Sequence, residues 1–156
     1  DHLAADPTVQ DNVVDYIGRG NALFATDWAY DLVEQTWPDA IDFYGDDTVL
    51  DSAQRAVAQA DLDDRVVARV TDDRLAAQLD TDELSLVYDF GNWAPIESVD
   101  ESQVTVWLRG DVRIQSDDGQ GQFELDDVPL LVSFQPTAAD TGTVIAGSVA
   151  STPLSP

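Results

Sequence analysis

The sequence predicts an α+β domain in which N-terminal helices pack on a curved antiparallel sheet of four to five strands. Apolar residues recur at helical spacing over residues 6–80 and alternate with polar ones over residues 84–150. A chain of 156 residues that is 44% hydrophobic is long enough to bury one core. We therefore expect a single domain over 1–156, with an extended tail at 151–156.

The first helix is expected to begin at Asp6-Pro7, an acid suited to the N-cap followed by proline at the first helical position. Apolar residues then follow at intervals of four: Val9, Val13 and Ile17. Gly18-Arg19-Gly20 interrupts the pattern. The helical pattern resumes after these residues and stops at Trp37-Pro38. Its apolar positions in this part are Leu23, Phe24, Trp28, Leu32 and Val33.

Two shorter helices are expected next. One spans about 51–60, and the other begins at a cap on Thr71 or Asp72 and runs to Leu79. Residues 61–74 fit no single secondary structure.

The apolar period changes to two at about Leu84, and residues 85–90 are predicted to form a strand. One long strand over 103–115 places six even-numbered residues on one face: Val104, Val106, Leu108, Gly110, Val112 and Ile114. The other face carries Thr105, Trp107, Arg109, Asp111, Arg113 and Gln115. A hairpin at 109–111 is the alternative, but unbroken parity favours one strand with Gly110 as a bend or bulge.

The remaining strands are separated by turns at 116–121 and 136–142. The apolar residues have odd numbers at Phe123 and Leu125 and even numbers from Val128 to Phe134, so a bulge or short loop is expected at Asp126-Asp127. A last strand is expected over 143–148.

Charge is the most informative property of the composition. The chain has 31 acidic residues, 7 basic residues and a net charge of −24. Nucleic acids and anionic membranes are excluded as direct partners because both require a basic surface. The 4 Trp, 4 Tyr and 5 Phe argue against a disordered chain.

Several catalytic chemistries lack the residues they need. There is no Cys and no Lys, and the one histidine is His2, so thiol, Schiff-base, triad and multi-histidine metal sites are excluded. The chain has five Asp-Asp pairs: Asp46-Asp47, Asp63-Asp64, Asp72-Asp73, Asp117-Asp118 and Asp126-Asp127. They are interpreted as solvated acids in turns and helix caps. Asp117–Gly121 is the best candidate for an ion site among them, because its glycines could wrap a loop around an ion. We predict no catalytic residue, no cofactor and no metal.

The Arg109-Gly110-Asp111 triplet is expected to lie within a strand, where Arg109 and Arg113 pair with acids or stack on an aromatic ring.

A composition that is rich in aspartate and free of lysine resembles that of proteins from extreme halophiles, the haloarchaea above all. This resemblance implies that monovalent salt is required for stability. The chain starts at Asp1 without methionine, so we expect a removed N-terminal segment or an excerpt. An extracytoplasmic or particle-associated location is expected, with a cytoplasmic one as the alternative.

Residues 27–32 and 43–50, a helix followed by a strand, resemble the opening of NTF2-like (cystatin-like α+β) domains, which include the VirB8-type domains of secretion systems. The resemblance implies a pocket between helix and sheet. Its mouth would be lined by Trp28, Trp37, Phe43 and Tyr44, unless these aromatic residues simply form the core. An enzyme there would use an aspartate with Tyr44 or Tyr88, as ketosteroid isomerases do.

The sequence therefore favours a non-enzymatic domain that acts through protein partners or self-association. It would belong to a surface, secreted or particle-associated component of a haloarchaeal cell or its virus. The alternative is an NTF2-like domain that binds a small molecule, or an enzyme based on carboxylates and tyrosines.

Overall fold

The computed structural model describes residues 3–26, 29–44, 55–56, 65–87, 94–115, 121–136 and 142–147. Its helices are α1 (Pro7–Gly18), α2 (Tyr30–Thr36) and α3 (Asp73–Leu79). Its strands are β1 (Ala22–Thr26), β2 (Ile41–Phe43), β3 (Arg55–Ala56), β4 (Arg65–Val70), β5 (Glu83–Val87), β6 (Ile96–Val99), β7 (Val104–Gln115), β8 (Gln122–Phe134) and β9 (Thr143–Gly147). Within these ranges no helix is long and apolar enough to cross a bilayer.

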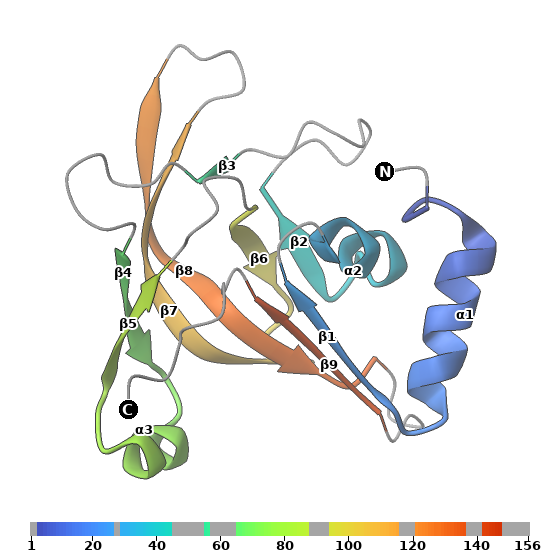
Figure 1. The fold of residues 1–156 in the computed structure, drawn as a ribbon, viewed down its shortest axis with the longest axis horizontal. Helices are drawn as coiled ribbons and strands as arrows, with labels where there is room; N and C mark the ends of the chain where they lie inside the picture. Colours follow the sequence, from blue (N-terminus) through green and yellow to red (C-terminus); the bar gives the residue numbers. More distant parts are fainter. Residues whose placement is uncertain are drawn as a thin grey trace.

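The architecture is α+β, as predicted, but the sheet is larger than expected. Six strands follow the order β1-β9-β8-β7-β4-β5, the short β3 also pairs with β7, and β2 and β6 form a separate ribbon. The long β7 and β8 curl the sheet into a half-barrel (Figure 1). The prediction of four to five antiparallel strands is wrong in number, and also in direction, because β1 pairs with β9 in parallel.

The predicted helix caps are confirmed, but the helices are not all N-terminal. The Asp6 side chain accepts a hydrogen bond from the Thr8 N–H at 2.8 Å, with proline at the start of α1. Asp72 caps α3 by accepting from the N–H groups of Arg74 and Leu75. Yet α3 lies between β4 and β5, within the sheet half of the fold.

Five segments whose periodicity indicated a helix or no regular structure form strands. Residues 22–26 form β1 rather than part of a helix, since Gly20 adopts a φ of 88° after α1 and the segment pairs with β9. The helix expected over 51–60 is wrong at 55–56, which form β3; its other residues lie outside the described part of the chain. The ribbon strands β2 and β6, together with strand β4, complete the five.

The long strand over 104–115 and the bulge opposite it are confirmed. Leu108, Val112 and Ile114 are buried, while Thr105 and Asp111 are exposed. Opposite Gly110 and Val112, β8 carries one extra residue, and Asp127 there adopts a φ of 54°. Gly110 is required by packing, because a Cβ atom at this position would lie 2.7 Å from the Val67 carbonyl oxygen.

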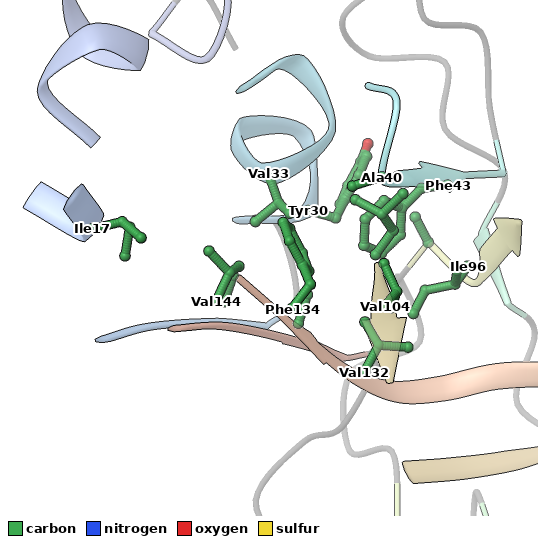
Figure 2. Packing of buried hydrophobic residues seen from close by; sticks show 14 residues of the cluster. Ile17, Tyr30, Val33, Ala40, Phe43, Ile96, Val104, Val132, Phe134 and Val144 are labelled. Atoms are coloured by element: carbon green, nitrogen blue, oxygen red, sulfur yellow. The ribbon is translucent and has the colours of Figure 1, made fainter. Parts of the chain in front are cut away.

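Two apolar clusters fill the inner side of the sheet. The first joins α1, α2 and the β2–β6 ribbon to β1, β7, β8 and β9. Figure 2 shows Val33 pointing toward Val144 and Phe134, while the Tyr30 ring lies beside Phe43. The second cluster lies on the inner side of β4, β5, the C-terminal half of β7 and the part of β8 that pairs with it. Leu75 and Ala76 of α3 pack against this cluster. The even-numbered side chains of β7 serve both clusters, so the opposite side of the sheet is left to face outward.

Candidate functional site

We call the side of the sheet opposite both clusters the outer face. The strand registers align one row across it: Phe24 of β1, Ile145 of β9, Ser133 of β8 and Thr105 of β7. Phe24 is 64% exposed, and Val67 on β4 is 61% exposed. Between them lie the half-buried Trp107, Leu131 and Ile145, of which Trp107 and Leu131 also contact the second cluster. Large apolar side chains are also exposed elsewhere on the described molecule. On the outer face they share one side of the sheet with half-buried apolar residues, and apolar surface gathered on one face is typical of surfaces that bind other molecules.

The Trp107 indole on this face is held in place. Its Nε1–H donates to the Ser133 Oγ at 2.7 Å across the β7–β8 pair. This bond satisfies the polar end of the ring, while part of the ring remains accessible. Such a fixed aromatic side chain loses little conformational entropy when it contacts a partner.

Four of the seven arginines lie on the outer face: Arg65 and Arg69 of β4, and Arg109 and Arg113 of β7. The predicted structural role of Arg113 is confirmed, since its Nη2 lies 2.9 Å from Glu124 Oε1 on the neighbouring strand. The outer face therefore has nearly balanced charge in a chain that is otherwise strongly acidic.

The bulge at Asp126-Asp127 is also tied into these arginines. Arg69 Nη2 contacts Asp127 Oδ1 at 2.7 Å, and Arg109 donates to the Asp127 carbonyl oxygen at 2.8 Å and to Glu101 at 2.7 Å. Asp111 accepts from the Asp127 N–H at 2.9 Å. The Arg109-Gly110-Asp111 triplet thus lies mid-strand, as expected, and its charged side chains also hold the bulge.

The predicted pocket aromatics that the structure describes pack into the core. Phe43 is 2% exposed, with its ring centroid 5.4 Å from that of Tyr30. Trp37 meets Phe134 edge to face at 5.6 Å. Tyr44 is half-buried, and burial followed by the nearby Glu97 charge raises the pKa of its hydroxyl. Trp28 and Tyr88 lie outside the described residues.

Two buried carboxylates on α2 were missed by the sequence analysis. Asp31 is 8% exposed and Glu34 is 7% exposed, one helical turn apart. Glu34 Oε1 accepts a hydrogen bond from the Phe43 N–H at 2.6 Å, which links α2 to the start of the ribbon. The available signal was the position of Glu34 four residues after Tyr30, on the stripe of α2 that faces the core.

Replacing Glu34 with alanine is expected to lower the free energy of unfolding by about 1–3 kcal/mol, because the Phe43 N–H would lose its acceptor in a buried place. Urea denaturation in molar KCl measures the change. Glu34→Gln is the matched control, since its amide oxygen can still accept this bond. Equal losses in both variants would show that the negative charge, not the hydrogen bond, is what α2 requires.

The other predicted candidates do not form a site in the part of the chain that is described. Asp72 is a helix cap and Asp127 belongs to the bulge, in agreement with the interpretation of the acid pairs as turn and cap residues. Asp46-Asp47, Asp63-Asp64, Asp117-Asp118 and His2 fall outside the described ranges. No described group of three or more His, Cys, Asp or Glu residues is arranged to hold a metal ion.

Comparison of the chain with protein-family models, with curated proteins and with solved structures found no match.

Proposed function

We propose that this chain is a non-enzymatic protein-interaction domain and that the outer face of its sheet is the contact surface. The observation that carries the proposal is the exposure of Phe24 and Val67 on either side of the fixed Trp107 indole. Aromatic side chains and arginine, the residue types gathered here, are enriched where proteins bind one another.

The charge of the outer face supports the same role. A partner that approaches any acid-rich surface of this chain meets a large negative field, whereas Arg69, Arg109 and Arg113 balance the acids around them on this face. Association costs least where unbalanced charge is lowest. The domain would operate at high salt, in a surface, secreted or particle-associated component of a haloarchaeal cell or its virus.

Site-specific photo-crosslinking in cells grown in molar salt tests this proposal. A photoreactive phenylalanine analogue replaces Val67, which is exposed and lies at the centre of β4. We expect discrete protein adducts from this position. The control places the same analogue at Ala77, exposed on α3 away from the outer face. Equal labelling from both positions, or none from either, would contradict an interaction role for the outer face.

A second candidate rests on the buried carboxylates of α2. An NTF2-like domain that binds a small molecule, or an enzyme based on carboxylates and tyrosines, would use Asp31 or Glu34 beside Tyr30 and Phe43. Thermal-shift screening of neutral and cationic metabolites tests it. A ligand whose stabilisation is lost in Asp31→Asn but kept in Val67→Ala would favour this candidate over the interaction domain.

A further inference from the structure

The strand order of the sheet ends in two edge strands, β5 and β1, which differ in how well they are protected from pairing with another strand. β5, at one edge, begins at Glu83 and is preceded by Asp80 and Asp82. Charged residues of this kind discourage another strand from pairing with an edge. β1, at the other edge, has no charged residue, no proline and no register shift along its whole length.

The uncharged stretch extends beyond the strand itself, over residues 20–26, between Arg19 and Asp27. In a chain with 31 acidic residues, this edge strand carries none of them, and neither does its neighbour β9. Among the described strands, β1 also has its partner β9 on one side only. Its other side is an edge that natural sheets usually block.

The hydrogen-bond phase of β1 shows which main-chain groups are directed outward. The Asn21 carbonyl accepts from the Thr143 N–H at 3.2 Å, so residue 21 and, by parallel alternation, residues 23 and 25 turn their main-chain groups toward β9. The main-chain groups of Ala22, Phe24 and Thr26 therefore point away from β9. The side chains of the same three residues lie on the outer face.

We propose that β1 pairs antiparallel with β1 of a second copy of this chain, around a twofold axis at Phe24. This register places Phe24 opposite Phe24 of the other copy and Ala22 opposite Thr26. Each pair exchanges its outward main-chain hydrogen bonds. The two sheets then form one continuous sheet, and their outer faces become a single surface with the two Phe24 rings at its centre.

Charge favours a second copy as the occupant. A twofold axis sets each residue of the strand opposite another residue of the same strand, so any acid in β1 would lie close to an acid of its twin. The absence of acids from 20–26 removes that repulsion at the contact itself. The remaining repulsion between two chains of −24 acts over longer distances, and molar salt screens it.

The inference goes beyond the proposed role of the outer face, because the contact between copies is the β1 edge and pairing enlarges the outer face instead of covering it. Sedimentation equilibrium of the full chain in molar KCl is expected to give twice the monomer mass of 16.9 kDa. Ala22→Asp combined with Thr26→Asp sets acids opposite acids and is expected to weaken dimerisation by about tenfold. Ala22→Arg combined with Thr26→Asp sets opposite charges face to face and is expected to restore it.

Two controls separate pairing from other effects. Ala77→Glu with Gln78→Glu adds the same charge on exposed α3 and is expected to leave the dimer unchanged. Because the chain has no cysteine, Phe24→Cys introduces a single thiol. Two such thiols at the axis lie within disulfide range, since paired Cα atoms are about 5.5 Å apart. Val67→Cys, equally exposed on β4, is the comparison and is expected to crosslink far more slowly.

A monomer in molar KCl at high protein concentration overturns the pairing. So does a dimer that is indifferent to both edge variants, or one that crosslinks as readily through position 67 as through position 24. If the monomer still gives photo-crosslinks from position 67, the proposed role of the outer face stands and only the pairing of β1 is wrong. If those adducts are also missing, both proposals fail.

Discussion

Replacing Leu108 with alanine is expected to lower the free energy of unfolding by about 2–5 kcal/mol. Leu108 is 3% exposed, and its side chain belongs to the second apolar cluster beside Ala68 and Leu130, which are fully buried. Removal of its three outer carbon atoms loses their transfer free energy and leaves a cavity.

Urea denaturation in molar KCl measures this effect, because urea is uncharged and leaves the screening of the acidic surface unaltered. Thr105→Ala is the control, since Thr105 is exposed on the outer face of the same strand. We expect it to cost less than about 1 kcal/mol. A Leu108→Ala protein as stable as Thr105→Ala would mean that β7 does not present its even-numbered residues to the core.

The elements predicted well are those whose signals are local and long. Asp6 and Asp72 identify helix starts through a single side chain placed before the helix. The parity of β7 extends over 12 residues, and its switch in β8 marks the bulge at Asp127. Each signal is complete within a short window, so no knowledge of distant partners is needed.

The elements predicted poorly are short strands whose partners lie far away in the chain. β1 has only five residues, and its Leu23 and Phe24 also fit a helical stripe with Trp28. Its strand conformation is decided by parallel pairing with β9, near the other end of the described chain. The ribbon strands β2 and β6, of three and four residues, show no alternation long enough to detect.

The candidate surface was predictable in part for the same reason. The parity of β7 correctly assigned Trp107, Arg109 and Arg113 to the face opposite the core. Phe24 could not be assigned to that face, because its strand was not recognised. Nor did the sequence distinguish the buried Asp31 and Glu34 from the many exposed acids, because a count of 31 acidic residues does not indicate which of them are buried.

The domain is expected to lose stability, or to unfold, when salt falls from molar to tens of millimolar. The accessible surface of 9228 Å² carries a net charge of −24. The Debye length grows from about 3 Å at 1 M to about 10 Å at 0.1 M, so carboxylates that are screened from one another in molar salt repel one another at low salt. Folded domains have only about 5–15 kcal/mol of net stability with which to withstand such repulsion.

Local attraction is too weak to replace the screening. In the Arg69–Asp127 pair both side chains are more than half exposed, and in the Arg109–Glu101 pair the acid is 72% exposed. Exposed pairs of this kind contribute at most about 1 kcal/mol each. Seven arginines cannot offset 31 acids at that strength.

Mild acid provides an independent test, because protonation of exposed carboxyls removes the same repulsion without added salt. The gain is limited by groups such as Asp100, whose pKa is lowered by hydrogen bonds from the Ser102 and Gln103 side chains and the Ser102 N–H. The folded state favours the charged form of Asp100. Its contribution is therefore present above the ordinary aspartate pKa and is lost as the pH falls through the lowered value.

Thermal melting followed by circular dichroism across a KCl series measures the salt dependence, with a second series at low salt from neutral pH toward about pH 4. We expect the melting temperature to rise steeply with KCl and more modestly with acid, since acid relieves repulsion but also weakens bonds like those of Asp100. Sucrose is the control, because it stabilises folded proteins without screening charge. A melting temperature that rises with sucrose but stays flat in KCl would show that the acidic surface is not an adaptation to salt, and the assignment to a high-salt organism would fail with it.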